Sequence, residues 1–289
     1  MALRLLVLDA YAPEGRASLR EAGGTEAGVL YERMLRRLAP RAAIDVAYPG
    51  DPDPVLPAPA DYDGVAWTGS SLTIHAAGDR RVARQIELAR VVYEAGIPSF
   101  GSCWAAQLSV AAAGGRCAAS PRGREFGIAR GIELTAAGRA HPLYRGKPAR
   151  FDAFTSHADE VVALCEGALL LASNEWSRVQ AVSVERGRGR FWALQYHPEY
   201  DPHEVAALCR IRRRELIAQG SFADEGAADD FIARLEALHE DLGRTDLAAS
   251  LGLDADLLDP DRRTIEVRNW LRSLEEAPSR APPSPSRPL

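Results

Sequence analysis

The most constraining feature of the chain is a short apolar segment that turns, at a cysteine, directly into a helix-forming segment. Residues 97–100 (Ile-Pro-Ser-Phe) follow a glycine and are typical of a buried strand. Residues 104–113 are rich in Ala, Leu and Val and run into two glycines, which predicts a helix with a glycine stop. Cys103 lies at the junction between small residues. A tight strand-to-helix turn requires such neighbours, because the two elements crowd together there.

This position suits a reactive thiol. The N-terminus of the following helix favours the thiolate, which is the nucleophilic form of cysteine. The backbone N–H of Trp104 would point toward an oxyanion that forms beside Cys103. A cysteine in isolation is more often buried and inert. The interpretation therefore depends on a base elsewhere in the chain.

A candidate base and its partner follow a later strand. Residues 191–196 (Phe-Trp-Ala-Leu-Gln-Tyr) come after a glycine-containing turn and read as a strand. His197 and Glu199 lie just past its end, and Pro198 fixes the backbone between them. Functional groups collect at the carboxyl ends of strands in open α/β sheets. We therefore expect Cys103, His197 and Glu199 to act as a nucleophile, a base and a group that orients the base.

The pattern along the first part of the chain alternates strands with helices. This alternation predicts an α/β fold with a mostly parallel open sheet and helices on both faces. From 130 to 196, short strands separated by turns predict antiparallel strands that join the sheet. We expect strands over 3–9, 43–48, 64–68 and 97–100, helices over 26–38, 80–95 and 202–219, and loops from Tyr11 to Gly24 and from Pro49 to Pro59.

These motifs resemble the class I (triad-type) glutamine amidotransferases. The family pattern is a Gly-x-Cys-x-Gly-x-Gln turn followed later by Gln-[Phe/Tyr]-His-Pro-Glu, and residues 101–107 and 195–199 match it. Two weaker segments also match: 63–71 resembles the glycine loop that supplies a second oxyanion N–H, and 155–161 resembles the Ser-His-x-Asp-x-Val segment of the GMP-synthase-like branch. The resemblance covers roughly residues 3–219 and implies a flavodoxin-like fold and a stand-alone member of the family.

The resemblance also implies further site residues. The glycine loop and the helix start would donate N–H groups to the oxyanion, and the turn and the second weak segment would contact the glutamyl group. No metal and no organic cofactor is implied. We expect oxyanion donors at Gly69, Ser70 and Trp104 and substrate contacts at Gln107, Ser156 and His157.

The chain departs from the family pattern at two places. Ala105 stands where the family usually has glycine, and the second oxyanion loop reads Gly-Ser-Ser over 69–71 instead of two glycines before a proline. Both changes would reshape the pocket for the γ-glutamyl group or its leaving group. The sequence therefore constrains the type of reaction more tightly than the substrate.

The implied reaction is hydrolysis of a γ-glutamyl C–N amide bond through a glutamyl thioester on Cys103. In one version the chain is a glutaminase subunit that passes ammonia to a separate synthase. In the other it hydrolyses γ-glutamyl amides or peptides with a larger amine, alongside a γ-glutamyl ligase, and the altered turn favours this version. Two alternatives are a non-catalytic binding protein and another cysteine hydrolase or protease on the same fold. The sequence leaves the oligomeric state, including a homo-oligomer, open.

Composition limits the other classes of function. The formal net charge of −5 argues against a general nucleic-acid binder. We find neither a signal-peptide pattern nor an apolar run near the ~20 residues that cross a bilayer, so we expect a cytoplasmic protein without a membrane anchor. Lys147 is the single lysine among 35 Lys and Arg residues, a bias typical of a GC-rich bacterial genome. The cysteines, which form no Cys-x-x-Cys pair and no zinc spacing, are Cys103, Cys117, Cys165 and Cys209.

The C-terminal part lies beyond the resemblance. We expect an amidotransferase-like domain over 1–219, a helical extension over 220–277, and a disordered Pro/Ser-rich tail over 278–289. Our hypothesis is that the extension covers a surface that meets the synthase in multidomain amidotransferases. Apolar residues recur at helical spacing in two stretches, which contain Phe231, Ile232, Leu235, Leu238 and Leu242, and Val267, Trp270, Leu271 and Leu274.

Overall fold

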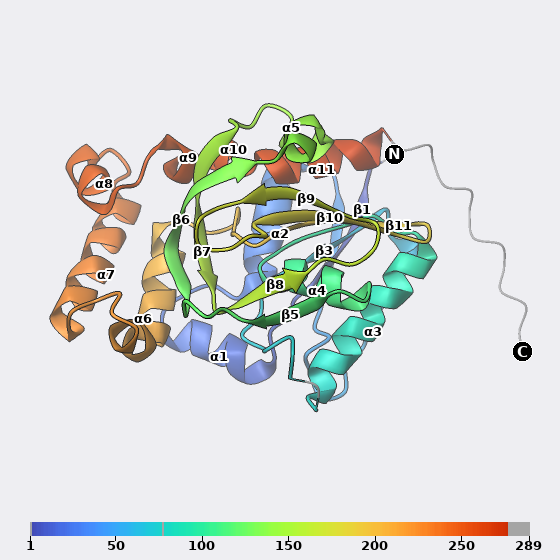
Figure 1. Cartoon of the computed structure of the whole chain (residues 1–289), viewed down its shortest axis with the longest axis horizontal. Coiled ribbons are helices and arrows are strands. Elements are labelled where there is room, and N and C mark those ends of the chain that lie inside the picture. Colours follow the sequence, from blue (N-terminus) through green and yellow to red (C-terminus); the bar gives the residue numbers. More distant parts are fainter. Residues whose placement is uncertain (1, 77, 277–289) are drawn as a thin grey trace, which may run out of the picture.

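The computed structural model describes residues 2–76 and 78–276, and shows an α/β fold built on one large sheet (Figure 1). Among the described residues, a separate two-stranded ladder pairs β5 (Arg116–Ala119) with β8 (Asp159–Ala163). The large sheet has nine strands in the described residues, in the spatial order β2 (Ala43–Ala47), β1 (Arg4–Leu8), β3 (Gly64–Trp67), β4 (Ser99–Ser102), β11 (Gly189–Leu194), β10 (Ala181–Arg186), β9 (Ala168–Ser173), β6 (Glu125–Leu134) and β7 (Arg150–His157).

The sheet has a parallel half and an antiparallel half. The pairs from β2 through β11 are parallel. The pairs from β11 through β7 are antiparallel. This arrangement confirms the predicted open parallel sheet and the predicted antiparallel strands that join it. It also places the carboxyl ends of β4 and β11 side by side, because Leu194 pairs with Ser102.

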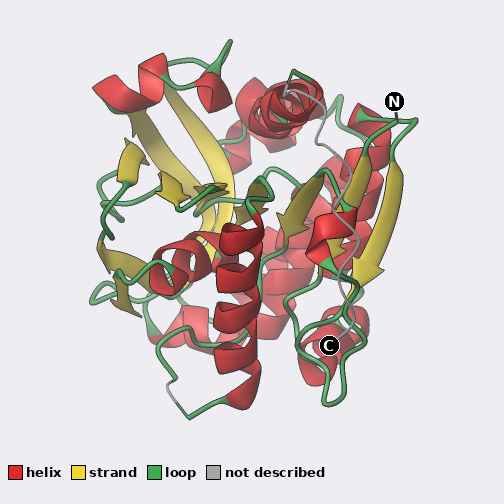
Figure 2. Ribbon diagram, turned by 90° about the vertical axis from the view of Figure 1, so that its right-hand side faces the viewer, coloured by secondary structure: helices red, strands yellow, loops and turns green. Residues whose placement is uncertain are grey.

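Helices cover both faces of the sheet, as the alternating pattern predicts (Figure 2). α3 (Arg80–Ala95) and α4 (Trp104–Ala112) share an apolar cluster with Leu6 and Leu8. α2 (Ala27–Leu38) and α11 (Ile265–Glu275) share another with Leu5 and Val7. Neighbouring strand residues point to opposite faces, so one buried strand supplies both clusters. The remaining helices are α1 (Pro13–Glu21), α5 (Ala136–Ala140), α6 (Pro202–Ala218), α7 (Glu225–Glu240), α8 (Thr245–Leu251), α9 (Ala255–Leu258) and α10 (Pro260–Arg263).

Local signals set several helix ends. The Asp79 side chain caps α3 by accepting a hydrogen bond from the N–H of Arg81 at 2.8 Å. Gly96 ends α3 in the left-handed region at φ 68°, where glycine pays no steric penalty. Asp201 caps α6 through the N–H of Glu204 at 3.1 Å, with a proline in the first turn.

The structure corrects three expectations. The segment from Tyr11 to Gly24 is not a loop throughout, because α1 occupies Pro13–Glu21. Its proline start was visible, but its polar sequence carries no strong apolar stripe. The last sheet strand ends at Leu194 instead of Tyr196. Leu242 lies beyond the end of α7 and is exposed.

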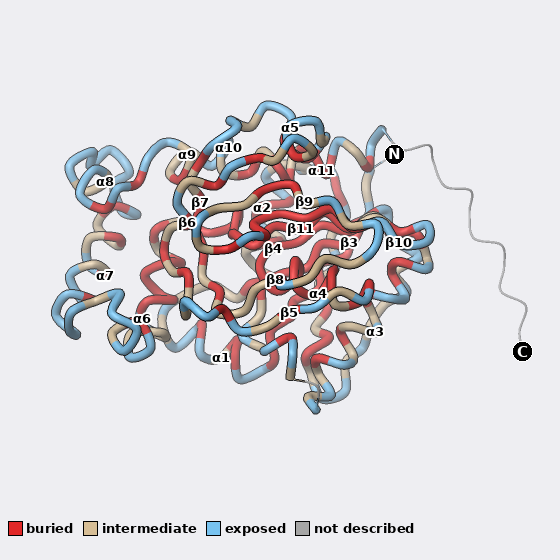
Figure 3. The backbone as a smooth tube through the Cα atoms, in the orientation of Figure 1, coloured by how far each residue is buried: buried red, intermediate tan, exposed pale blue. Residues whose placement is uncertain are grey.

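The C-terminal helices divide into an outer and an inner part. Figure 3 shows mostly exposed or half-buried backbone along α7 and α8, whereas α11 runs beside the buried strands. A Cβ on Gly64 of β3 would lie 2.7 Å from the Leu274 side chain and 2.9 Å from the Trp270 ring, so α11 packs directly on the sheet. The division at 219 stays a prediction, and the expected tail over 278–289 lies outside the described residues. No helix in the described part of the chain has the length and apolarity to span a membrane.

Candidate active site

Cys103 occupies a strained turn between β4 and α4. Its φ of 53° makes it the one non-glycine residue with positive φ in the described part of the chain. Such a backbone costs of order 1–3 kcal/mol and persists only where the surroundings hold it. Here the N–H of Cys103 donates to the carbonyl of Leu194 at 2.7 Å, which ties the turn to the end of β11. The side chain is nearly buried, with 6% of the residue exposed.

Gly101 explains why the altered turn still fits. A Cβ on Gly101 would lie 2.4 Å from the Cβ of Ala105 and 2.4 Å from the carbonyl oxygen of Trp67. No side chain fits at position 101. The methyl group of Ala105, where the family usually has glycine, occupies the space that Gly101 leaves open.

His197 and Glu199 form a buried pair next to this turn. Nδ1 of His197 donates to Oε1 of Glu199 at 2.7 Å, and both side chains are almost fully buried. Within the described residues, Nε2 of His197 has no hydrogen-bond partner. The ring stacks on Tyr200, with 3.8 Å between centroids and 6° between planes. The imidazole is therefore fixed in orientation, and one nitrogen remains available for a proton transfer.

The electrostatics of the pair favour a charged imidazole. Burial by itself lowers the pKa of His197, but the Glu199 carboxylate and the Cys103 sulfur oppose it and raise the pKa to about 9. An imidazolium beside a thiolate is the reactive form of a cysteine nucleophile and its base.

A chain of hydroxyl groups supports Glu199 from the far side. Oγ of Ser102 donates to Oε1 of Glu199 at 2.9 Å, and the hydroxyl of Tyr31 on α2 donates to Oγ of Ser102 at 2.7 Å. Burial, together with the nearby Glu199 charge, raises the pKa of Tyr31 well above its usual value, so the phenol stays a donor. Sequence reasoning did not find Tyr31, because no motif links it to the turn.

The predicted oxyanion loop lies against the histidine. A Cβ on Gly69 would lie 2.9 Å from Cε1 of His197 and 3.7 Å from Cβ of Cys103, so the loop, the ring and the thiol adjoin. Oγ of Ser70 donates to the carbonyl of Ala10 at 2.9 Å, which anchors the loop. Trp104 begins α4, where backbone N–H groups lack intrahelical partners. The oxyanion role of these N–H groups remains a prediction.

The Trp104 side chain does not crowd the site. Its indole is almost fully buried, and Nε1 donates to Oε1 of Gln85 at 3.0 Å. Gln85 in turn donates to the carbonyl of Ala10 at 3.1 Å. The bulky residue therefore braces the same backbone that anchors Ser70.

The three residues predicted to contact the substrate differ in what their polar groups contact. Nε2 of Gln107 donates to the carbonyl of Asp159 at 3.0 Å. The carbonyl of Ser156 faces the Cys103 sulfur at 3.7 Å. His157 is buried, and its nitrogens contact the carbonyl of Asp159 at 2.9 Å and the Glu125 carboxylate at 2.8 Å. These residues line one cleft, but neither nitrogen of His157 is free, and the predicted substrate contacts stay predictions.

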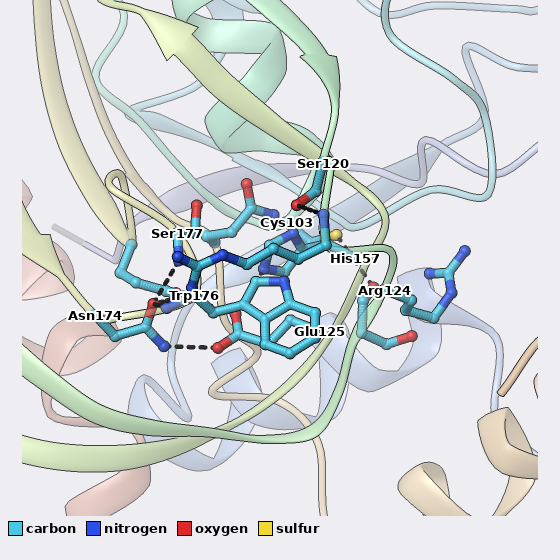
Figure 4. A network of polar contacts seen from close by, with 12 residues as sticks. Cys103, Ser120, Arg124, Glu125, His157, Asn174, Trp176 and Ser177 are labelled. Carbon is cyan, nitrogen blue, oxygen red and sulfur yellow. Dashed lines mark hydrogen bonds and ion pairs between the residues drawn. The ribbon is translucent and has the colours of Figure 1, made fainter. Parts of the chain in front are cut away.

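A polar network extends from His157 behind the cleft (Figure 4). The Glu125 carboxylate, which contacts His157, also accepts from Asn174 at 2.6 Å and from Gln180 at 2.8 Å. Asn174 accepts from the N–H groups of Trp176 and Ser177. The network fixes the loop after β9 against the start of β6 and the end of β7, where Ser156 and His157 line the cleft.

The cleft above Cys103 has an empty volume of about 390 Å³, open solvent included. Sequence reasoning missed two basic residues in its lining, Arg124 and Arg212. Nε of Arg124 pairs with Glu215 at 2.9 Å, and Arg212 comes from the same helix as Glu215. Among the described residues, no group of His, Cys, Asp or Glu side chains is arranged to hold a metal ion.

Comparison with known proteins identifies the family. A model of the glutamine amidotransferase class-I family matches residues 75–208. The chain is 33% identical over 278 residues to a γ-glutamyl-L-1-hydroxyisopropylamide hydrolase from Pseudomonas sp., a match that covers 94% of this chain and 93% of the relative. The chain belongs to the class I glutamine amidotransferase family.

Other members of this amidotransferase family match parts of the chain or its fold. A GMP synthase (glutamine-hydrolyzing) from Thermomicrobium roseum is 34% identical over 167 residues, and the match covers 57% of this chain and 30% of that protein. A glutamine amidotransferase structure from Thermotoga maritima has a TM-score of 0.65 at 14% identity and covers 96% of this chain and 100% of its own. One from Methylobacillus flagellatus has a TM-score of 0.65 at 19% identity and covers 97% and 98%. The two structures establish the fold.

Proposed function

We propose that this amidotransferase-family enzyme hydrolyses the C–N bond of substituted γ-glutamyl amides and releases glutamate and an amine. The observation that carries the proposal is the buried His197–Glu199 pair, whose imidazole adjoins Gly69 together with the strained Cys103 and keeps one nitrogen without a partner among the described residues. The Pseudomonas relative, named as a hydrolase of a substituted γ-glutamyl amide, matches nearly the whole chain. That relative favours a substituted amide over glutamine as the substrate.

The first half of the reaction forms an acyl-enzyme. The Cys103 thiolate attacks the γ-carbonyl carbon, and the oxyanion that forms lies near the N–H groups of Gly69 or Ser70 and of Trp104. The His197 imidazolium then donates its Nε2 proton to the amide nitrogen. The C–N bond breaks, the amine leaves, and the glutamyl group stays on the sulfur as a thioester.

The second half returns the enzyme to its resting form. Neutral His197 takes a proton from water, and the hydroxide oxygen attacks the thioester carbon. The C–S bond breaks, glutamate leaves, and the thiolate is restored beside the imidazolium. Glu199 keeps the ring in one orientation throughout. No step calls for a metal ion or an organic cofactor.

The GMP synthase relatives support a second candidate, a glutaminase subunit that delivers ammonia to a separate synthase. Glutamine and a substituted amide undergo the same chemistry at Cys103, so the distinction lies in the space for the leaving group. A γ-glutamyl ligase would be the partner of the first function and a synthase the partner of the second.

Glutamate release from purified protein tests the proposal. We expect release from γ-glutamyl alkylamides to exceed release from glutamine, and Cys103→Ala to abolish both. Cys165→Ala is the matched control, since Cys165 is also a free cysteine but lies outside the cleft lining. Release mainly from glutamine would favour the ammonia-delivering subunit. No Cys103-dependent release from any substrate would overturn the hydrolase and favour a binding protein.

A further inference from the structure

A second hollow adjoins the Cys103 cleft, between α1 and α6, which lie side by side (Figure 1). We call it the α1–α6 hollow. Its empty volume is about 540 Å³, open solvent included. Apolar side chains from both helices form much of its wall, namely those of Leu19, Leu208 and Ile211. Ser71 and Arg212 line both spaces, so the two hollows meet at these residues.

The two spaces differ in chemistry. The Cys103 cleft presents Arg124, Asp159, Gln107 and Ser156, which suit a glutamyl group with its charged α-amino and α-carboxylate groups. The α1–α6 hollow presents the apolar side chains of its wall, and its acidic residue Glu14 already pairs with Arg81. A γ-glutamyl amide has the same asymmetry, because one end is zwitterionic and the amine substituent is apolar.

Tyr11 connects the hollow to the reacting atoms. It is part of the wall of the hollow and is 7% exposed. Burial raises the pKa of Tyr11, and the next contributions are the charges of Cys103, which raises it, and Arg212, which lowers it. Tyr11 also belongs to the same apolar cluster as Tyr200, whose ring stacks on His197. It therefore joins the wall of the hollow to the side chains packed around His197.

Glycine at position 15 keeps α1 close to this junction. A Cβ on Gly15 would lie 2.7 Å from Oγ of Ser71 and 2.8 Å from the Tyr11 ring. Nε of Arg212 is buried and has no hydrogen-bond partner among the described residues. Where the cleft and the hollow meet, the wall is therefore tightly packed, and one donor, Nε of Arg212, has no acceptor among the described residues.

We infer that the α1–α6 hollow binds the amine part of the substrate and selects a short aliphatic substituent that carries no charge. The inference rests on the proposed function and adds the position and chemistry of the leaving group. With the glutamyl group held beside Cys103, the substituent on the amide nitrogen passes Ser71 and Arg212 and packs against Leu19, Leu208 and Ile211.

A homologous series of γ-glutamyl methyl-, ethyl-, propyl- and butylamides measures this binding. Each methylene that enters the hollow should raise kcat/KM roughly fourfold, up to the length that fills it. Ile211→Phe fills the hollow and should flatten the series. Ile211→Ala widens it and should move the best substrate to a longer chain. Ile217→Phe, the same change in the same helix away from the hollow, should reproduce the wild-type series.

The outcomes separate this inference from the proposed function. Cys103-dependent hydrolysis with a flat series in the wild-type enzyme would overturn the hollow as the amine site and leave the hydrolase standing. Equal effects of Ile211→Phe and Ile217→Phe would overturn it as well. If the wild-type enzyme hydrolyses no γ-glutamyl amide, both this inference and the proposed function are overturned. Thermal melting of the variants checks that they fold. The shift of the best substrate to a longer chain in Ile211→Ala tests the inference without adding a larger side chain.

Discussion

Among the described residues, two buried histidine–glutamate pairs lie near the same cleft, and they differ in what the second nitrogen of each histidine contacts. His197 contacts Glu199 at 2.7 Å, and His157 contacts Glu125 at 2.8 Å. The second nitrogen of His157 also faces an oxygen acceptor, the carbonyl of Asp159. The second nitrogen of His197 has no partner in the described part of the chain, and the ring adjoins Gly69 together with Cys103.

The comparison teaches that burial and a carboxylate partner do not identify a catalytic histidine. Both imidazoles are held in place, but of the two only His197 keeps a nitrogen without a partner in the described residues, which the proposed proton transfer requires. The carboxylates differ too. Glu125 accepts three side-chain hydrogen bonds, so it ties β6 to β7 and to the loop after β9. Oε2 of Glu199 has no partner within the described residues.

The largest difference in kcat/KM should appear when each of the two histidines is replaced by glutamine in turn. His197→Gln removes the group that moves protons, and kcat/KM should fall by about 10³-fold or more. His157→Gln should change kcat/KM of the folded enzyme by less than about tenfold, because its ring nitrogens hold the cleft wall and do not move a proton. Glutamate release under matched conditions, with circular dichroism to check folding, decides between them. Equal losses would remove the distinction between the two pairs.

The next effect concerns the pH dependence of the catalytic pair. With a pKa of about 9, the His197 imidazolium is present at neutral pH and is lost as the pH rises, so kcat/KM should decline above about pH 9. Glu199→Gln removes the main contribution that raises this pKa and leaves the burial that lowers it. The decline should then begin at lower pH, and kcat/KM should fall about 100-fold.

A kcat/KM profile for the wild-type enzyme and Glu199→Gln measures this shift, with Glu125→Gln as the matched control. The control should keep the wild-type position of the decline. An unmoved decline in Glu199→Gln would show that Glu199 does not act through the imidazole.

The third effect concerns stability instead of activity, and it involves the Glu125 network instead of the His197–Glu199 pair. Glu125→Gln puts an NH₂ group where Asn174 and Gln180 donate, so at least one buried donor loses its acceptor. We expect the free energy of unfolding to fall by about 2–3 kcal/mol. Urea titration measures the loss, and the folded fraction should keep most of its activity. An unchanged unfolding midpoint would show that the network does not stabilise the fold.

The smallest effect concerns the hydroxyl chain behind Glu199. Ser102→Ala removes the hydrogen bond to Oε1 of Glu199 and should lower kcat/KM by about three- to tenfold, the equivalent of about 1 kcal/mol. Tyr31→Phe leaves the Ser102 bond in place and should have a weaker effect. If Tyr31→Phe is the more damaging change, the phenol acts on the fold of α2 instead of on the triad.

The fold and the proposed catalytic trio could be predicted from sequence because their signals are local. The small residues beside Cys103 indicate a tight turn, and His197 and Glu199 are two residues apart with a proline between them. α1 was missed because its buried residues, Gly15, Arg16 and Leu19, are mostly not apolar. Tyr31 and Arg212 were missed because they reach the site from helices that carry no catalytic motif.

The sequence alone determined the mostly parallel sheet, the strained turn at Cys103 and the pairing of a histidine with a carboxylate two residues away. Each follows from steric and hydrogen-bonding preferences within a short segment. Only the tertiary structure decided which buried histidine keeps a free nitrogen. Glu125 reaches His157 from 32 residues away, because antiparallel pairing of β6 with β7 places them opposite each other. The same packing of distant elements set α1 against α6 beside the cleft, because Leu19 of α1 is buried in an apolar cluster with Leu208 of α6.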